Sequence, residues 1–305
     1  MKIIRGYGIF LFSISILWAF WLQLSAGPHG SSSQKEEAPW FLPADLALKP
    51  SQYTILDTRS YLRRLKNKIP GSKYISWEDL SRSDLPHKGE LLELKIVRKK
   101  ISDLGIKEKD YILVLGDGIS GWGEEGRIVW SLREAGFYNS YWVEGGYSAF
   151  EKEFQKKSNN KGNKEINLDK SNNMNMRSTA IRKEEIIKGL STQKFQILDT
   201  REPREFSGAT PYGESRGGHI PGAKSLFYQD LFDAKGNIKS KSEVENSLKQ
   251  LGIQKEKPIV AYCTGGVRSA FVVGILRTYG YNAYNYAGSM WEWSHDPKLP
   301  LETNH

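Results

Sequence analysis

The single cysteine of the chain, Cys263, lies where a thiol can be activated. It follows the apolar run Ile259–Tyr262, and it precedes Gly265, Gly266 and a helical pattern over 270–279. A strand that ends here delivers the thiol to the edge of a parallel sheet at which ligands bind. The glycines let successive backbone N–H groups turn toward one anion, and the following helix adds the positive end of its dipole. The pattern therefore predicts a lowered pKa for Cys263 and a nucleophilic thiolate.

Arg268 adds a fixed positive charge near the same thiol, and a charge of this sign favours thiolate over thiol. The loop that Arg268 closes also contains Thr264 and Val267. A free cysteine at the end of a strand can instead be a buried, inert residue. The flanking glycines and the arginine favour the reactive interpretation.

The unit that contains Cys263 has a second copy earlier in the chain. Residues 53–59 read YTILDTR and residues 195–201 read FQILDTR, and an Ile-Pro-Gly triplet follows each of them, at 69–71 and at 220–222. Each copy then continues with an apolar strand, a glycine-rich loop, a helical stretch and an aromatic-rich closing turn. The chain is therefore expected to contain two repeats of one structural unit.

Within each repeat, short β-branched runs alternate with helical patterns. Ser240 and Glu243, for example, have capping-box spacing before a helix that we expect to end near Gly252. Such alternation is typical of an α/β fold in which helices cover both faces of a parallel sheet. The sequence predicts two tandem domains of this class.

Composition divides the 305 residues into four parts. The stretch 155–177 is rich in Asn and Lys and nearly free of large apolar residues, so it cannot offset the entropy of ordering and is interpreted as a linker. The expected domains are residues 39–154 and residues 178–305. Residues 1–38 form an N-terminal leader with its spacer.

The leader has the pattern of an export signal. Lys2 and Arg5 precede an apolar run over 8–24, and a spacer rich in Gly, Ser and Pro follows over 26–33. A positively charged start before an apolar stretch is typical of a secretory signal, and the same stretch could remain as a membrane anchor. Cleaved signal and retained anchor stay open, but both place the folded part outside the cytoplasm, in the periplasm.

Five separated motifs resemble the rhodanese-type sulfurtransferases, specifically the tandem-domain thiosulfate and 3-mercaptopyruvate sulfurtransferases. They read DTRE, EFSG, GGHIPGA, IVAYCTGGVRS and YAGSMWEW, in the order that the family has them, and the resemblance covers both halves, roughly residues 40–300. The resemblance implies that Cys263 accepts a sulfane sulfur, holds it as a persulfide and passes it to cyanide or a thiol. It also implies that neither a metal nor an organic cofactor is needed. The substrate-binding loop would consist of Thr264, Gly265, Gly266, Val267 and Arg268.

The resemblance assigns two further residues and shows two departures. Asp199 matches a family aspartate that braces the loop, and Arg201 matches an arginine near the mouth of the site. Thr264 stands where many thiosulfate enzymes carry a basic residue. Glu205 stands where vertebrate-type enzymes carry a substrate-contacting arginine, and the adjacent Arg204 could substitute for it.

The first repeat is predicted to be catalytically silent. Alignment of the strands places Gly116 opposite Cys263, so persulfide chemistry is impossible there. The following loop contains a GxGxxG pattern, but Asp117, Glu124 and Glu125 would repel a pyrophosphate, and a degenerated catalytic loop explains the glycines better. Trp122 in this loop could lie either at the interface with the second repeat or in the local core.

The predicted activity is transfer of sulfur from thiosulfate, a small anionic donor, to a cyanide or thiol acceptor. Alternatives are 3-mercaptopyruvate as donor and a non-enzymatic carrier of sulfane sulfur. A phosphatase is disfavoured because only four residues separate Cys263 from Arg268, which suits one sulfur atom better than a phosphoryl group. The net charge of +9 comes from scattered lysines and is interpreted as favouring solubility rather than nucleic-acid binding.

Overall fold

The computed structural model describes residues 38–45, 47, 53–158 and 177–303. The predicted export signal or anchor over 8–24 and most of the predicted linker lie outside these residues. Among the helices of the described residues, none has the length and apolar character needed to cross a membrane. We refer to residues 38–158 as the N-terminal half and to residues 177–303 as the C-terminal half.

Each half is built on a sheet whose strands are all parallel. In the N-terminal half the strand order is β1-β5-β4-β2-β3, and in the C-terminal half it is β7-β6-β8-β9. The strands are β1 (Phe41–Leu42), β2 (Thr54–Asp57), β3 (Lys73–Tyr74), β4 (Ile112–Leu115), β5 (Ser140–Val143), β6 (Gln196–Asp199), β7 (Lys224–Ser225), β8 (Ile259–Tyr262) and β9 (Ala283–Asn285).

The registers of the central strands confirm the alignment of the two repeats. Asp57 of β2 pairs with Leu115 of β4, and Asp199 of β6 pairs with Tyr262 of β8. Gly116 and Cys263 are thus both the first residue after the central strand of their sheet. The position that bears the thiol in one half bears a glycine in the other.

Helices connect successive strands in both halves. The α-helices are α1 (Tyr61–Lys66), α2 (Leu94–Asp103), α3 (Glu124–Glu134), α4 (Gly146–Ser158), α5 (Lys183–Ser191), α6 (Pro203–Phe206), α7 (Lys241–Gln250), α8 (Val267–Thr278) and α9 (Ser289–Trp293). The expected capping box is present at α7, where the Ser240 hydroxyl accepts a hydrogen bond from the Glu243 N–H. Helix α4 continues past residue 154, the expected end of the first domain, to Ser158.

Alternate residues of the central strands pack on opposite faces of each sheet, as the parallel-sheet prediction requires. On β8, Ile259 and Ala261 join the core that contains α8, whereas Val260 and Tyr262 join a second core under α5 and α9. On β4, the alternate side chains divide in the same way between a core with α3 and a core with α4. The predicted α/β class, with helices on both faces of each sheet, is confirmed.

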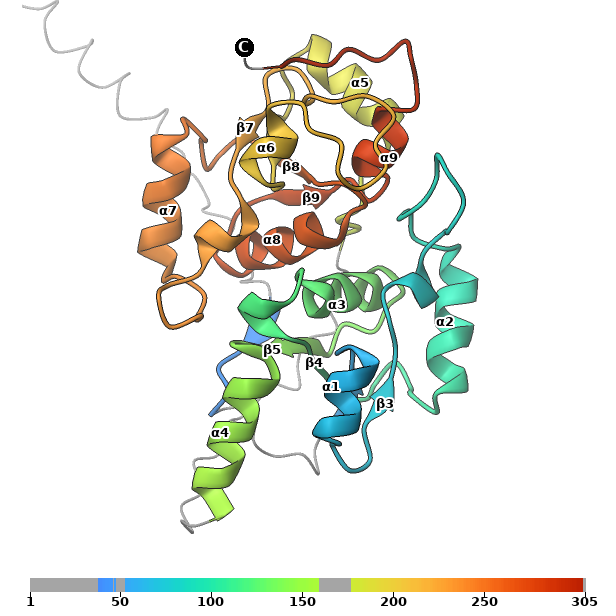
Figure 1. Cartoon of the computed structure of the whole chain (residues 1–305), viewed down its shortest axis with the longest axis vertical. Coiled ribbons are helices and arrows are strands. Elements are labelled where there is room, and N and C mark those ends of the chain that lie inside the picture. The colour runs from blue at the N-terminus through green and yellow to red at the C-terminus, as the bar shows by residue number, and fades with distance from the viewer. Residues whose placement is uncertain (1–37, 46, 48–52, 159–176, 304–305) are drawn as a thin grey trace, which may run out of the picture. The chain divides into compact units, whose positions relative to one another are not determined.

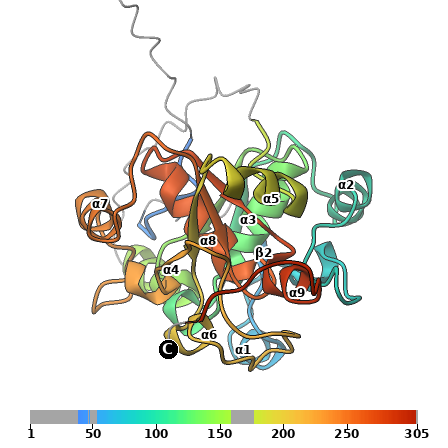
Figure 2. The same ribbon diagram turned by 90° about the horizontal axis from the view of Figure 1, so that it is seen from above.

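The two sheets share one hydrophobic core, because α3 and α8 lie between them and pack on each other (Figure 1). Figure 2 shows α7 and α2 on opposite flanks of this central pair. The helices approach closely at Gly126, where an added methyl group would lie 2.6 Å from the Cα of Phe271. The N-terminal half is therefore in direct contact with the helix that follows Cys263.

Candidate active site

The thiol of Cys263 lies at the carboxyl end of β8, and its residue is 1% exposed. The Gly266 N–H donates to Sγ at 3.1 Å, and the Ser269 hydroxyl lies 3.7 Å from the same atom. Gly266 has a φ of 77°, a left-handed conformation that turns its N–H back toward the sulfur and starts α8. The backbone N–H of Cys263 itself donates to the Ser289 hydroxyl at 3.0 Å. The loop thus directs hydrogen-bond donors at the sulfur.

The surroundings lower the pKa of the Cys263 thiol. Burial acts in the opposite direction, because it disfavours the charged form. The positive charge of Arg268 outweighs it together with hydrogen bonds from the Ser269 N–H, the Ser269 hydroxyl and the Gly265 N–H. The direction is the one that the sequence predicts, and the physical causes are the expected ones.

Arg268 is held by a buried carboxylate. Its two terminal nitrogens donate to the two oxygens of Glu205 at 2.7 and 2.9 Å, and one of them also donates to the Thr264 hydroxyl at 2.7 Å. The Thr264 hydroxyl in turn donates to Glu205 at 2.8 Å. The Arg268 side chain is 3% exposed and that of Glu205 is fully buried. The cation predicted to hold a substrate anion is therefore already engaged, and Glu205 belongs to the site although the sequence marked it only as a departure.

Two aromatic rings flank the guanidinium of Arg268. Its central carbon lies 5.1 Å from the ring of Trp122 and 5.7 Å from the ring of Tyr212, and the two rings meet edge to face. Trp122 comes from the N-terminal half, whereas Tyr212 and Arg268 come from the C-terminal half. Of the two interpretations of Trp122, the structure supports the interface.

Asp199 and Arg201 form a buried pair behind the loop. The Arg201 guanidinium donates to the Asp199 carboxylate, with a shortest distance of 2.6 Å, and to the Gly218 carbonyl at 2.8 Å. Asp199 also accepts from the Tyr262 hydroxyl at 2.6 Å, which ties β6 to the residue that precedes Cys263. The side chain of Arg201 is 1% exposed, so it braces the site in this conformation rather than opening toward solvent.

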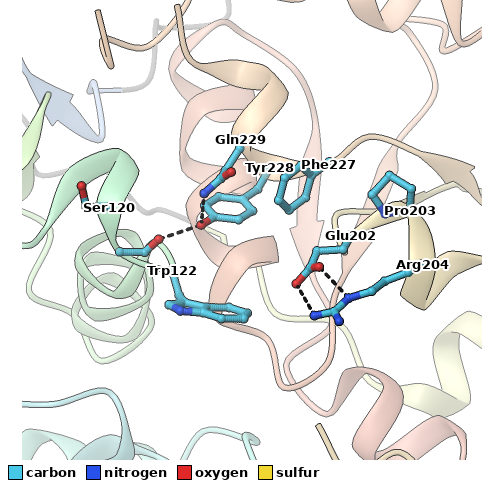
Figure 3. Close-up of a pocket in the computed structure, with 9 residues that line it drawn as sticks. Ser120, Trp122, Glu202, Pro203, Arg204, Phe227, Tyr228 and Gln229 are labelled. Carbon is cyan, nitrogen blue, oxygen red and sulfur yellow. Dashed lines mark hydrogen bonds and ion pairs between the residues drawn. The ribbon is translucent and has the colours of Figure 1, made fainter. Parts of the chain in front are cut away.

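Arg204 is exposed and lies beside a pocket between the two halves. It donates to Glu202 at 2.8 Å and to the Tyr212 hydroxyl at 3.3 Å. The pocket has a volume of about 520 Å³, and Figure 3 shows Trp122 on one side of it facing Glu202 and Arg204 on the other. The remaining lining residues are Ser120, Gly121, Pro203, Phe227, Tyr228 and Gln229. Cys263 does not line this pocket.

A second arginine reaches the loop from the N-terminal half and was not singled out from the sequence. Arg127 of α3 is fully buried, and its guanidinium donates to the Gly266 carbonyl at 3.0 Å. The same group donates to the Gly89 carbonyl at 2.6 Å and to the Ser81 hydroxyl at 2.9 Å. Arg127 and Gly266 are far apart in the sequence, so no local spacing could have indicated this contact.

The loop that bears the thiol is covered on its glycine side. Gly265 packs directly against the ring of Trp291, so that a side chain at position 265 would overlap this ring. Gly89 of the N-terminal half has a φ of 89°, and a Cβ there would lie 2.5 Å from the Gly265 carbonyl oxygen. The Lys88 ammonium lies 4.2 Å from the centre of the Trp291 ring. Trp291 and Gly89 thus cover the glycine side of the loop.

The corresponding loop of the N-terminal half is longer and filled by a carboxyl group. Gly116 and the left-handed Gly123 that starts α3 are seven positions apart, whereas Cys263 and Gly266 are three apart. The second residue of α3 is Glu125, which matches Arg268 in α8, and its carboxyl group occupies the space in front of Gly116. Burial raises the pKa of Glu125 to about 8.

One cluster of potential metal ligands lies elsewhere in the described residues. His87, Glu90 and Glu292 bring a ring nitrogen and carboxylate oxygens within 4.8 Å of one another. His87 is already hydrogen-bonded to Glu90 at 2.7 Å, and Glu292 accepts from the Tyr286 hydroxyl at 2.8 Å. Because these bonds account for the cluster, we assign no metal to it.

Comparison with known proteins agrees with this architecture. The model of the rhodanese-like domain matches the chain twice, over residues 43–153 and 182–296. The chain belongs to the rhodanese-like family. It is thus a rhodanese-family sulfurtransferase with two copies of the domain, as the motifs predict.

Two curated relatives of the rhodanese chain match over most of their length. The thiosulfate sulfurtransferase of Azotobacter vinelandii is 26% identical over 267 residues, which cover 85% of this chain and 95% of the relative. The 3-mercaptopyruvate sulfurtransferase of Mus musculus is 25% identical over 274 residues, which cover 84% of this chain and 90% of the relative. A shorter match, 35% identical over 128 residues, is to the sulfur carrier protein TtuD of Thermus thermophilus and covers 39% of this chain and 44% of that protein.

Solved structures share the fold of this chain. The 3-mercaptopyruvate sulfotransferase SseA from Escherichia coli has a TM-score of 0.64 at 23% identity, with 83% of this chain and 99% of that chain covered. A complex of an EanB variant with ergothioneine has a TM-score of 0.70 at 18% identity, with 88% of this chain and 71% of that chain covered. At these identities the likeness concerns the fold alone.

Proposed function

We propose that Cys263 moves a sulfane sulfur from thiosulfate to cyanide or a thiol. The observation that carries the proposal is the thiol with a lowered pKa at the end of β8, to which the Gly266 N–H donates at 3.1 Å. A thiolate is the reactive form in attack on a sulfur–sulfur bond. The relatives named thiosulfate sulfurtransferase, which match over most of this chain, support the choice of donor.

The reaction proceeds in two balanced steps. The Cys263 thiolate attacks the outer sulfur of thiosulfate, the S–S bond of the donor breaks, and its electron pair leaves with sulfite. The cysteine then holds a persulfide anion. Cyanide attacks the terminal sulfur, thiocyanate leaves, and the thiolate is restored, which is a ping-pong cycle.

The loop supplies positive potential to each anion in this cycle. The N–H groups of Gly265 and Gly266 and the amino end of α8 point toward the sulfur and would hold the persulfide charge. Arg268 lies beside them, but its charge is balanced by Glu205. The anionic head of the donor would therefore compete with Glu205 for the guanidinium.

Two other activities are supported by specific observations. The relative from Mus musculus is a 3-mercaptopyruvate sulfurtransferase, and 3-mercaptopyruvate carries one negative charge where thiosulfate carries two. The thiol is 1% exposed, and the Thermus thermophilus relative is named a sulfur carrier protein. A covered persulfide suits storage and delivery to one partner.

Thiocyanate formation from cyanide with each donor tests these activities. We expect many turnovers with thiosulfate, and none in Cys263→Ser. Ser207→Ala, at an exposed position beyond α6, is the control, because it changes a side chain by a similarly small amount away from the thiol. This variant should turn over like the unaltered protein. Turnover with 3-mercaptopyruvate but not with thiosulfate would make 3-mercaptopyruvate the donor in place of thiosulfate. Loading of one sulfur per chain without turnover would favour the carrier, and folded protein that loads no sulfur from either donor would overturn the proposal.

We further propose that the protein works outside the cytoplasm, in the periplasm, because Lys2 and Arg5 precede the apolar run 8–24. Fractionation of cells that express the full chain should place it outside the inner membrane or on its outer face. Retention of the whole pool in the cytoplasmic fraction would contradict export.

A further inference from the structure

Arg127 crosses from the N-terminal half to the loop that holds Cys263. It lies on α3, is fully buried, and donates to the carbonyl of Gly266, the residue whose N–H donates to the sulfur. Its other hydrogen-bond partners are the Gly89 carbonyl and the Ser81 hydroxyl, both from the N-terminal half, and its central carbon lies 4.7 Å from the centre of the Trp130 ring. All three acceptors are neutral oxygens.

The charge of Arg127 is not neutralised by any carboxylate ion pair within the described part of the chain, and its Nε has no hydrogen-bond partner there. The other buried arginines near the two loops are each paired, Arg268 with Glu205 and Arg201 with Asp199. Burial of an unpaired guanidinium is costly, since the cation loses its hydration. A fold that retains such a group gains from it where a negative charge appears nearby.

The negative charge that acts on Arg127 is that of Cys263. Burial lowers the pKa of Arg127 to about 10, and attraction to the Cys263 thiolate acts in the opposite direction. The guanidinium therefore stays protonated at neutral pH and acts as a fixed cation next to the loop. In the low-dielectric interior such a charge is screened much less than it would be at the surface.

We propose that Arg127 is a positioning residue that stabilises the anionic sulfur on Cys263, by its charge and by its hydrogen bond to the Gly266 carbonyl. The N-terminal half, which has no thiol, thus supplies a cation that no carboxylate pairs with in the described residues. The cation of the C-terminal half next to the thiol, Arg268, is paired with Glu205. This role of Arg127 rests on the proposed function in one respect, that the anion it stabilises during turnover is the persulfide. Stabilisation of the thiolate itself requires no sulfur donor.

Several other charged and polar groups face the thiol or the residues in contact with it. Helix α8 contributes Arg268 and Ser269, and Glu205 of α6 balances Arg268. Glu214 accepts from the Thr264 hydroxyl at 3.3 Å, and it lies on the Arg268 side of the loop. Arg268 is the main charge that favours the thiolate, although Glu205 pairs with it, and Arg127 adds a second positive charge that no carboxylate offsets in the described residues.

The rate of Cys263 alkylation by iodoacetamide, measured against pH, tests the proposal on the full chain. In Arg127→Met we expect the apparent pKa of the thiol to rise by about one unit, which is about a tenfold loss of thiolate at a given pH below it. Arg127→Lys keeps the charge and should restore most of the shift. Arg127→Gln keeps a donor for the Gly266 carbonyl but no charge, so it should behave like the methionine variant and serves if that variant does not fold.

Arg133→Met is the matched control. Arg133 is another buried arginine of α3, and it donates to the Ser140 carbonyl, away from the thiol. Its loss should change thermal stability without changing the titration of Cys263. Folded Arg127→Gln or Arg127→Met protein with an unchanged thiol pKa would overturn the proposal, and so would a lysine variant that titrates like the neutral ones. Failure of sulfur transfer in the unaltered protein leaves this titration unaffected, so the two proposals fail separately.

Discussion

At the residue scale, Glu205 decides how much of the charge of Arg268 reaches the sulfur. The two side chains form a two-pronged ion pair, almost completely buried, and Thr264 closes the triangle. Such a pair is nearly neutral when seen from a few ångströms away, so it holds the loop in place more than it attracts anions. A donor anion meets backbone N–H groups first and a shared guanidinium second.

Glu205→Gln should lower the pKa of the Cys263 thiol and the KM for thiosulfate, and it should also lower the stability of the fold. Without the carboxylate, the charge of Arg268 acts fully on Cys263, so the thiol pKa should fall further and the KM for thiosulfate should decrease. Loss of one partner of a buried pair should cost about 3 kcal/mol of stability. Alkylation against pH, initial rates and urea unfolding measure the three effects.

Glu202→Gln is the matched control for this change, because Glu202 forms its ion pair with the exposed Arg204 and meets the charge of Arg268 only as a minor effect. The two glutamates lie three positions apart, so the comparison separates the buried pair from the general effect of removing a charge nearby. An unchanged thiol pKa and KM in folded Glu205→Gln would show that Arg268 does not act on the sulfur.

The sequence predicted the residues of the site that are close to the thiol along the chain. Strand, glycines and Arg268 follow Cys263 directly, so local pattern and spacing indicated them. Glu205 and Arg127 were assigned no such role, because each meets the loop through a contact between distant segments. Hydrophobic periodicity indicates whether a residue lies in a helix or a strand, but it does not indicate which residue of another segment its side chain contacts.

At the element scale, the two loops differ in length and in the residue that faces the position of the thiol. The loop before α3 has seven positions where that before α8 has three, and Glu125 stands where α8 has Arg268. The carboxyl group of Glu125 fills the space in front of Gly116, and its Oε2 has no hydrogen-bond partner in the described residues. The sequence predicted the silent loop from the missing thiol, whereas the filling by Glu125 required the structure.

Glu125→Gln should remove a dependence of stability on pH. Burial raises the pKa of Glu125 from 4.5 to about 8, so the native state keeps a proton that the unfolded chain loses. Stability should therefore fall as the pH rises through this interval, by about 1.4 kcal/mol per unit at most. Urea unfolding at a series of pH values should show the unaltered protein losing stability toward pH 8, and the variant losing less.

Glu108→Gln, at an exposed position before β4, is the control for this series. It should follow the unaltered protein at every pH. Well below the ordinary pKa of a glutamate, Glu125→Gln and the unaltered protein should be about equally stable, because Glu125 is then protonated in both the folded and the unfolded state. Parallel pH curves for Glu125→Gln and the unaltered protein would contradict the raised pKa.

At the scale of the whole molecule, the two halves share a hydrophobic core. Helix α8 contributes Phe271 and Ile275 to it, and α3 contributes Ile128 and Leu132. The repeat and the α/β class were predictable, since each follows from local alternation within one half. The faces through which the halves would be joined were not predictable. Helix α3 is buried on most of its surface although it carries charged residues, and α8 is apolar on most of its surface, so neither helix has one apolar face that indicates its partner.

The C-terminal half alone, residues 178–305, should not fold as a stable unit. Without α3 it exposes the apolar side chains of α8, and exposed apolar area of this kind favours aggregation. We expect an insoluble product, or one without a cooperative thermal transition, whereas both halves expressed together should form a soluble complex. Calorimetry and size-exclusion chromatography distinguish these outcomes. A soluble, cooperatively unfolding C-terminal half would show that the shared core is dispensable.

The pairing of α3 with α8 also bears on how a duplicated gene can diverge. Counted from the left-handed glycines that start the two helices, Arg127 corresponds to Ala270, and Arg268 corresponds to Glu125. Neither copy has an arginine at both positions, so one copy cannot replace the other. A chain made of two C-terminal repeats would have two thiols and no guanidinium at the position of Arg127. Each half therefore brings to the loop around Cys263 a group that the other half does not have, the thiol from one and the Arg127 guanidinium from the other.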